Sequence, residues 1–319
     1  MLASPVLAPG VVLEDVPCPM GCPQDDEPVL RASDRISGVG GTFQLVRCRG
    51  CGLARTNPRP TRETIGRYYP NEYAPYQYTR AAVPVKRSPR SPLRRLARRV
   101  IDFNSDHLPP VVARHALEIG CASGAYLAYL ASLGWTAEGV ELNAAAAACA
   151  QDRGFRVQTS SVEAMQPPQL PPSLIVAWMV LEHLHDPIGA LRRFREWTTD
   201  GARLVASVPN FSAWGGAAFG REWYPLQLPC HLYHYQKETL APLLARGGWL
   251  LERVFYHRTL NDFLASAGNV AETRGREGVA ERLRAVAKKR NFHLAMYPVA
   301  AAVAAAGQTG RMTFWAKRA

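Results

Sequence analysis

The sequence predicts an α/β fold, in which helices cover both faces of a mostly parallel sheet, with a small cysteine-rich module in front of it. Two observations carry this prediction. From residue 113 onward, short apolar strands alternate with helical patterns, which is typical of β–α–β units. Four of the seven cysteines lie before position 52, in two closely spaced pairs. With 319 residues, 47% of them hydrophobic, the chain can build one large core and a small second module.

Charge and composition narrow the class of protein. The chain has 38 Lys and Arg against 26 Asp and Glu, a formal net charge of +12, which favours anionic partners without selecting among them. The N-terminus lacks the basic flank of a signal peptide, and no apolar run reaches the roughly 20 residues of a membrane-spanning helix. The odd number of cysteines suits a reducing compartment. We therefore expect a cytoplasmic protein without a transmembrane segment.

Residues 1–80 are predicted to form a zinc-ribbon domain. Cys18 and Cys22 are followed, after a strand-like stretch at 42–46, by Cys48 and Cys51. Two such pairs allow four thiolates to surround one Zn²⁺ tetrahedrally. Because a closed four-cysteine site has no open position for substrate, we expect this zinc to be structural. The alternative is four unligated thiols in a loop-rich segment.

Two segments connect this domain to the α/β half. A tyrosine-rich strip either docks the ribbon on the larger domain or walls a substrate site. Its tyrosines are Tyr68, Tyr69, Tyr73, Tyr76 and Tyr78. Residues 81–112 are predicted to be a basic linker, whose helix has Ser91 as its N-cap and Pro92 as its first residue and presents arginines on one face. We expect that face to be solvated, with contact to an anionic partner as the alternative.

A glycine turn follows the first strand of the α/β half, residues 116–119. The turn contains Gly120 and Gly124, and the next strand, 137–141, ends on Glu141. Glycines at a strand–helix turn let a ligand approach the backbone, and an acid that ends the next strand can accept hydrogen bonds from a ribose. The pattern therefore indicates a nucleotide-type ligand at this turn.

These motifs resemble those of class I S-adenosylmethionine-dependent methyltransferases. Residues 117–124 are similar to the first motif of that family and 139–141 to its second. Residues 160–163 resemble the loop after the third strand, and 180–187 resemble the V-L-E-H-x-x-D-P motif after the fourth. The resemblance implies a Rossmann-like methyltransferase domain over 113–319, with S-adenosylmethionine as cofactor.

Two departures from the family pattern are visible. Ala122 stands where the middle glycine of the first motif is usual, a change that a methyl side chain should tolerate. Ser173 stands where an aspartate often opens the fourth strand, so the contribution of that acid is absent.

The resemblance also implies roles for particular cofactor-site residues. Glu118 would lie behind the methionine end of the cofactor, Glu141 would bind the ribose hydroxyls, and Leu142 would stack on the adenine. Glu182 and His183 would cap the next helix and line the pocket floor, with a metal or acid–base role as the alternative. The complete predicted cofactor set is Glu118, Gly120, Cys121, Ala122, Ser123, Gly124, Glu141, Leu142, Ser161, Val162 and Glu182.

The segment 223–235, here called the acceptor segment, resembles the acceptor side of cytoplasmic methyltransferases that carry the same four-cysteine domain. In the sugar C-methyltransferases of that group it reads H-E-H-x-x-Y, and its last His is a base candidate. His231 matches that His, whereas Cys230 replaces the Glu and His234 replaces the Tyr. We predict that His231 is a general base and that His234 and Tyr224 orient it or the substrate. There are two alternatives. His231 is a structural residue that hydrogen-bonds the backbone, or it binds a metal together with His234 and Cys230.

Residues 258–310 are an insertion between the strands predicted at 250–256 and 312–317. The insertion divides into a basic polar helix at 272–290 and an Ala-rich segment at 294–306. It is either a helical lid over the acceptor site or extra packing at the sheet edge.

The sequence thus predicts methyl transfer from S-adenosylmethionine to a small-molecule acceptor, a sugar or secondary metabolite methylated on oxygen or carbon. The positive charge favours an anionic acceptor. An RNA methyltransferase is the first alternative, but no base-flipping motif of the Asn/Asp-Pro-Pro-Tyr type is present, so no specific nucleic acid is expected. The second alternative is a binding protein with an inactive methyltransferase fold, against which the intact glycines and acids argue.

Overall fold

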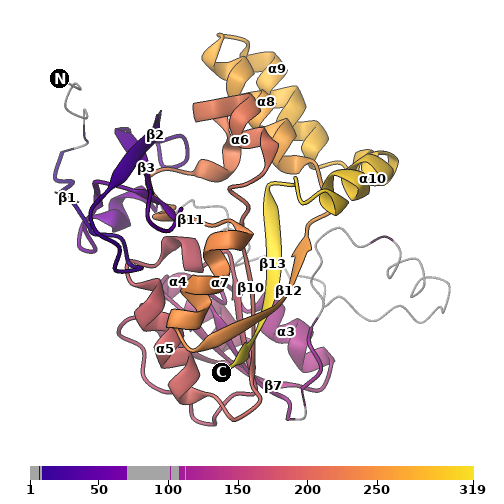
Figure 1. Cartoon of the computed structure of the whole chain (residues 1–319). Coiled ribbons are helices and arrows are strands. Elements are labelled where there is room, and N and C mark those ends of the chain that lie inside the picture. Colours follow the sequence, from indigo (N-terminus) through magenta and orange to yellow (C-terminus); the bar gives the residue numbers. More distant parts are fainter. Residues whose placement is uncertain (1–6, 8, 70–100, 102–107, 112) are drawn as a thin grey trace.

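The computed structural model describes residues 7, 9–69, 101, 108–111 and 113–319 (Figure 1). A seven-stranded sheet in the order β12-β13-β10-β9-β6-β7-β8 forms the centre of the α/β half. Its strands are β6 (His115–Ile119), β7 (Thr136–Glu141), β8 (Arg156–Thr159), β9 (Leu174–Trp178), β10 (Arg203–Pro209), β12 (Trp249–Tyr256) and β13 (Arg311–Arg318). The strands from β6 to β10 are paired in parallel, whereas β13 runs antiparallel to both of its neighbours. This topology confirms the predicted mostly parallel sheet.

Helices on the sheet follow from the apolar pattern of the chain. The helices α3 (Ala125–Ser132), α4 (Ala144–Asp152), α5 (Pro187–Trp197) and α7 (Lys237–Arg246) alternate with the strands. Pro187 occupies the start of α5, where its missing N–H costs nothing, and the Asp186 carboxylate accepts the Gly189 N–H at 2.8 Å. The buried face of α5 carries Leu191 and Phe194. The strand β9 is buried along nearly its whole length, as expected for a parallel strand covered on both faces.

The N-terminal module contributes a second sheet of four strands, in the order β11-β4-β3-β2. Its strands are β2 (Asp26–Ser33), β3 (Thr42–Cys48), β4 (Ala54–Thr56) and β11 (Tyr233–His234), and a separate pair joins β1 (Leu13–Glu14) to β5 (Arg59–Pro60). The strand β11 belongs to the acceptor segment and pairs with β4 across the Tyr233–Arg55 and His234–Ala54 positions. The acceptor segment therefore completes the sheet of the N-terminal module.

The two parts also share one hydrophobic core. Cys18, Cys48 and Leu53 of the N-terminal module belong to the same buried cluster as Leu191 of α5 and Leu243 of α7. Tyr68, within the short helix η1 (Ile65–Tyr68), packs edge-on against Phe43 with ring centroids 5.5 Å apart. Tyr73, Tyr76, Tyr78 and nearly all of the predicted linker 81–112 lie outside the described residues.

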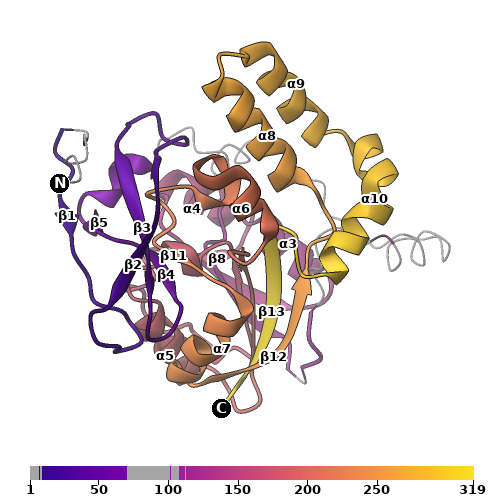
Figure 2. The ribbon, with the colours of Figure 1, turned by 45° about the horizontal axis from the view of Figure 1, so that its top comes forward.

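The insertion differs from the prediction. Instead of one helix at 272–290, α8 (Asn261–Thr273) and α9 (Glu277–Ala287) are separate helices, followed by α10 (Arg290–Ala305). Gly275 lies between the first two with φ +70°, a left-handed conformation that ends a helix. Figure 2 shows α8 and α9 packed side by side at one end of the sheet, with α6 (Trp214–Phe219) next to α8. Among the described residues, no helix is long and apolar enough to span a membrane.

Candidate active site

The glycine turn after β6 has the backbone conformation that the sequence predicts. Gly120 and Gly124 have φ values of +70° and +76°. A Cβ on Gly120 would lie 2.9 Å from Val180 Cγ2, and one on Gly124 would lie 2.9 Å from Ala150 Cβ, so both positions also lack room for a side chain. Ala122, with φ 45°, adopts the left-handed conformation as well, at a cost of about 1–2 kcal/mol for a non-glycine residue.

The carboxylate of Glu141 joins the end of β7 to this turn. Its Oε2 accepts the Ala122 N–H at 2.8 Å, and its Oε1 accepts the Asn143 N–H at 2.8 Å. A carboxylate oxygen can accept more than one hydrogen bond, so both oxygens retain capacity for ribose hydroxyls. Leu142, the next residue, is 63% exposed and is free to meet an adenine. These features fit the ribose and base of the implied cofactor.

Glu118 is the buried acid behind the turn. Its Oε2 has no hydrogen-bond partner. Burial raises the pKa of Glu118 well above its ordinary value, and the charge of Glu141 raises it further, while the Leu127 amide opposes both effects. A buried, unpartnered carboxyl oxygen is satisfied by a ligand that brings positive charge or a donor. The implied cofactor brings both, in its sulfonium and its ammonium, so the residues at the turn fit it.

Four other predicted cofactor residues have side chains that are buried or hydrogen-bonded within the protein. The Cys121 side chain packs into the core, where Gly139 makes room for it, so Cys121 offers only its backbone to a ligand. Ser123 is also buried, and its carbonyl accepts from Arg153. Ser161 accepts the Ala164 N–H through its Oγ at 3.2 Å. Val162 belongs to the main core.

The short helix η2 (Leu181–His183) follows β9 and lies next to the turn, because β6 and β9 are neighbouring strands. The acceptor segment packs directly on η2. The Leu232 N–H donates to the Glu182 carbonyl at 2.7 Å, and the Tyr235 hydroxyl donates to the Leu181 carbonyl at 3.0 Å. The cofactor turn and the acceptor segment therefore meet at η2.

At this meeting point, Glu182, His183 and His231 each place one candidate ligand atom within 4.8 Å of the others. The rings of His183 and His231 stand edge to face, with centroids 4.7 Å apart. The sequence assigned Glu182 to the cofactor and His231 to the acceptor, and the structure brings the two together. We call these three residues the acceptor-side cluster.

His231 has one ring nitrogen occupied and one carrying a lone pair. Its Nδ1 lies 2.8 Å from the Pro225 carbonyl oxygen, which can only accept, so Nδ1 carries the proton and Nε2 is unprotonated. The side chain is only 1% exposed. Burial lowers the pKa of His231 well below 6.5, and the neighbouring His183 and His234 lower it further. His231 is therefore neutral at a pH where an exposed imidazole would already carry a proton.

The other two predicted catalytic residues are differently placed. His234 lies in β11 with its Nε2 3.4 Å from Thr56 Oγ1, and burial lowers the pKa of its imidazole to about 3. Tyr224 lines a cavity of about 210 Å³, between β2, the acceptor segment and α8, which neither His231 nor His234 lines. The Tyr224 N–H donates to Ser266 of α8 at 2.8 Å, which ties the insertion to the acceptor segment.

Three further residues lie near the cluster, two of which, Thr56 and Arg311, carried no signal in the sequence. The Tyr69 hydroxyl is 2.8 Å from His183 Nδ1, which shows that one tyrosine of the predicted strip reaches the site. Thr56 of β4 donates to the His231 carbonyl at 2.7 Å. Arg311 begins β13 at the same sheet edge, and its charge acts on the pKa values of both Glu182 and His231. These contacts join segments more than 40 residues apart, which no local pattern reveals.

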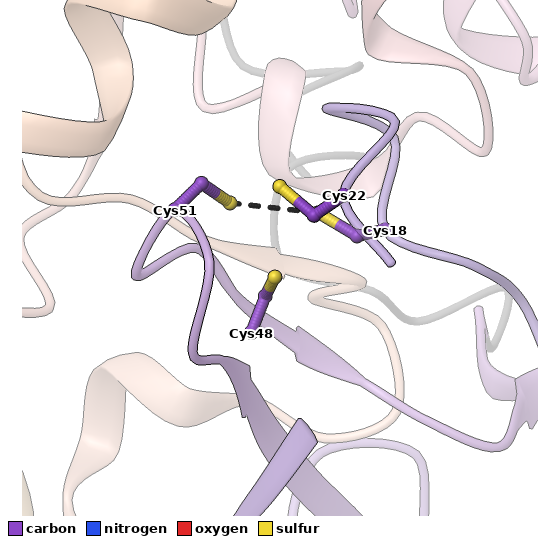
Figure 3. Close-up of side chains that lie close together, drawn as sticks. All are labelled: Cys18, Cys22, Cys48 and Cys51. Atoms are coloured by element: carbon purple, nitrogen blue, oxygen red, sulfur yellow. Dashed lines mark hydrogen bonds between the residues drawn. The ribbon is translucent and has the colours of Figure 1, made fainter. Parts of the chain in front are cut away.

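The four predicted zinc ligands converge in the structure (Figure 3). The sulfur atoms of Cys18, Cys22, Cys48 and Cys51 lie within 4.8 Å of one another, and the Cys18 and Cys51 sulfurs are 3.5 Å apart. Desolvation acts against the Cys48 thiolate, but hydrogen bonds from the Cys51 and Gly50 amides and from Cys18 leave the pKa of Cys48 lowered. Four converging thiols with amide donors beside them are a donor set suited to one Zn²⁺.

Cys230 is not part of either ligand group. Its thiol lies 3.4 Å from the Tyr68 carbonyl oxygen. Among the described residues, the groups that gather three or more candidate ligand atoms are the four cysteines and the acceptor-side cluster. The alternative metal set of His231, His234 and Cys230 is therefore wrong.

Comparison with known proteins gives one family match. A family model described as a methyltransferase domain matches residues 90–254, slightly more than half of the chain. Among solved structures, an S-adenosylmethionine-dependent methyltransferase from Mesorhizobium loti is 16% identical, covering 70% of this chain and 97% of that chain, with a TM-score of 0.41. The magnesium protoporphyrin IX methyltransferase from Synechocystis PCC 6803 with bound S-adenosylhomocysteine is 12% identical, covering 65% and 75%, with a TM-score of 0.41. No curated protein sequence matches the chain.

Proposed function

Because the chain belongs to the methyltransferase-domain family and is a class I S-adenosylmethionine-dependent methyltransferase, we propose that its acceptor is a small molecule, a sugar or another secondary metabolite methylated on oxygen or carbon. The observation that supports this is the burial of the acceptor side. Glu182 is fully buried, and His231, within the acceptor segment, is 1% exposed, so the proposed base is shielded from bulk solvent. Such shielding suits a small acceptor held beside the cofactor, whereas a base within a folded RNA must first be extruded to reach a buried group.

The chain's own residues have three tasks in the proposed reaction, which are to hold the cofactor, to align the acceptor and to accept a proton. S-adenosylmethionine, when bound, supplies an electrophilic methyl group on a positively charged sulfur. The turn at 120–124, with Glu118 behind it and Glu141 at the ribose, would hold that cofactor in place. Most of the rate enhancement then comes from aligning the acceptor atom with the methyl group in a site that excludes water.

His231 has the third task, which is to receive a proton. The acceptor's oxygen or carbon forms its bond to the methyl group while the methyl–sulfur bond breaks, and Nε2 of His231 takes the proton that the acceptor loses. The Nδ1–H bond to the Pro225 carbonyl holds the ring in the tautomer that this step requires. Thr56, through the His231 carbonyl, positions the same segment from the N-terminal module.

We further propose that the acceptor is anionic. Arg311 is half-buried at the sheet edge, and its positive charge favours the charged forms of Glu182 and Asp262 while it disfavours protonation of His231. A carboxylate or phosphate on the acceptor would be attracted to this guanidinium.

The proposal is tested by offering the enzyme both kinds of acceptor. The chain is incubated with methyl-labelled S-adenosylmethionine and, separately, with the low-mass metabolites and the total RNA of one cell extract. We expect label in a low-mass product and none in RNA above the background of the His231→Ala variant. Label that accumulates in RNA alone would overturn the proposed acceptor class.

RNA binding gives a second, independent prediction. A protein that contacts many phosphates through Lys and Arg side chains loses affinity steeply as salt rises. The logarithm of its binding constant falls against the logarithm of the salt concentration by about 0.7–0.9 for each phosphate contacted. We expect only weak RNA binding at physiological salt, measured by fluorescence anisotropy. Tight binding of one structured RNA, with a slope reporting several phosphates, would contradict the prediction.

Glu141→Ala should weaken cofactor binding. The substitution removes the carboxylate that would bind the ribose hydroxyls and that also accepts the Ala122 and Asn143 amides. The expected loss is about 1–3 kcal/mol, or about 5- to 150-fold in the dissociation constant measured by calorimetry. Glu138→Ala, on the same strand but away from the turn, is the control and should bind normally. Unchanged affinity in Glu141→Ala would remove this acid from the cofactor site.

We also propose that the four-cysteine cluster holds one structural zinc ion. All four sulfurs would bind the ion, so the site would have no open coordination position for a substrate. The cluster sits between the N-terminal sheet and the shared core that reaches α5 and α7. The zinc would therefore stabilise both the module and the edge against which the acceptor segment pairs.

A further inference from the structure

The acceptor-side cluster has a composition that the methyl-transfer step does not require. One base is sufficient for that step. The structure instead gathers two imidazoles and a carboxylate, from η2 and from the acceptor segment, with their candidate ligand atoms within 4.8 Å of one another. Metal–ligand bonds to such groups are about 2.0–2.2 Å long, so only a small contraction would bring the three atoms around one cation.

His231 is already in the tautomer that a cation needs, and His183 can adopt it. His231 Nδ1 is 2.8 Å from the Pro225 carbonyl, and His183 Nδ1 is 3.0 Å from the Cys230 carbonyl. The Pro225 carbonyl can only accept, so His231 carries its proton on Nδ1 and a lone pair on Nε2. His183 Nδ1 also lies 2.8 Å from the Tyr69 hydroxyl, and in the tautomer in which Nδ1 donates to the Cys230 carbonyl the Nε2 of His183 carries the lone pair. Hydrogen bonds from the distal nitrogen to backbone carbonyls are the usual support of metal-binding histidines, because they fix the ring and raise its basicity.

Glu182 is the member whose environment is least satisfied. Its side chain is fully buried, and neither carboxylate oxygen has a hydrogen-bond partner. Arg311 acts on it through its charge, without an ion pair between the two among the described residues. An ionised buried carboxylate without partners is strongly unfavourable, and a cation bound to it removes that penalty.

The donor set selects the kind of cation. Mg²⁺ and Ca²⁺ prefer oxygen ligands, whereas two imidazoles with one carboxylate suit Zn²⁺, Co²⁺ and Fe²⁺. Three protein ligands also leave positions open, unlike the closed set of four cysteines. His183 is only half-buried, so the cluster is not completely sealed from the acceptor side.

We propose that Glu182, His183 and His231 bind one divalent transition-metal cation, in addition to the zinc of the four cysteines. The cation occupies the Nε2 lone pair of His231, so the metal-bound chain cannot use that nitrogen as a base. Metal binding and base catalysis therefore exclude each other. Only this last consequence rests on the proposed function, because the cation site itself is independent of it.

The test uses cobalt as a probe that reports its own ligands. The full chain, with one equivalent of zinc on the cysteines, is titrated with Co²⁺ and followed by visible absorption. We expect one further equivalent to bind with weak d–d bands and no thiolate charge-transfer band. Glu182→Gln, nearly the same shape without the charge, and His183→Gln should each raise the cobalt dissociation constant at least about tenfold. His185→Gln, two residues away and bonded to the Pro60 carbonyl, is the matched control and should bind normally.

Three results would overturn the proposal: no second equivalent of cobalt, thiolate bands showing exchange at the cysteines, or normal binding in both cluster variants. Thermal unfolding of each variant shows whether it is folded, and only folded variants are compared for cobalt binding. Methyl transfer is measured separately and should fall in proportion to cobalt occupancy. A chain that binds cobalt as expected but methylates no small molecule would contradict the proposed function and leave the cation site standing.

Discussion

His231→Ala is expected to lower kcat for methyl transfer by about 10²–10⁴-fold, the usual cost of losing a general base, with little change in the affinity for S-adenosylmethionine. The reason is geometric. Nε2 of His231 carries the lone pair at the point where the acceptor segment meets η2, while the cofactor residues Glu118 and Glu141 lie in other elements. Single-turnover kinetics and cofactor calorimetry on the same preparation measure the two quantities.

A structural role for His231 makes a different prediction. Thr56→Ala removes the hydrogen bond to the His231 carbonyl but keeps the imidazole, so it should cost clearly less than His231→Ala. If His231→Ala retains more than about a tenth of the wild-type kcat, positioning alone explains so small a loss and His231 is not the base.

The pH profile adds a check with a definite sign. A base acts in its neutral form, which is present above its pKa. Burial holds the pKa of His231 well below 6.5, with His183, His234 and Arg311 adding to the effect, so this base should remain active as the pH falls through 6.5. Glu182 belongs to the same cluster, and burial raises the pKa of its carboxyl to about 8. A change in kcat near pH 8 is therefore expected in the wild-type chain and should disappear in Glu182→Gln.

Cys48→Ser is expected to remove the zinc and unfold the N-terminal module. The zinc content measured by elemental analysis should fall from one ion per chain to near zero, because three thiolates do not complete the site. A structural zinc contributes on the order of 10 kcal/mol to folding, more than a small module of this kind can replace. Because β11 of the acceptor segment pairs with β4 of this module, kcat should fall with it, while cofactor binding at the turn should be largely preserved.

Cys149→Ser is the matched control for this prediction. Cys149 is a half-buried cysteine of α4, distant in sequence from both pairs, and its loss should change neither zinc content nor folding. Proteolysis and hydrogen exchange of residues 9–69 report the module directly. A zinc-free Cys48→Ser chain in which these residues remain ordered would refute the structural role of the metal.

The insertion shows where periodicity stops being informative. The sequence suggested one basic helix at 272–290, but α8 begins at Asn261 and ends at Thr273. The buried positions of α8 are small or polar: Ser266 accepts the Tyr224 amide of the acceptor segment, and Asn269 donates to the carbonyl of Glu222 just before that segment. Phe263 adds an aromatic contact with Trp223. A helix whose buried face mixes small, polar and aromatic residues has no continuous apolar stripe to detect.

The central sheet, the glycine turn and the two pairs of cysteines were determined by the sequence alone. They depend on local rules: apolar strands of the right length, glycines where φ is positive, and short spacers that let two thiolates converge. The family match covers residues 90–254, which include the glycine turn and the parallel strands β6 to β10 but not the two pairs of cysteines. Information of this kind is carried by neighbours along the chain.

The acceptor side was decided only by the tertiary structure. The sequence placed Glu182 with the cofactor and His231 with the substrate, offered Tyr69 only as one of five tyrosines that could dock the ribbon or wall a substrate site, and gave no reason to place Thr56 or Arg311 near either. Their contacts follow from the pairing of β11 with β4 and the seating of the acceptor segment on η2, both of which join distant parts of the chain. The pKa of His231 depends on the same packing, because burial is a property of the assembled fold and not of the residue.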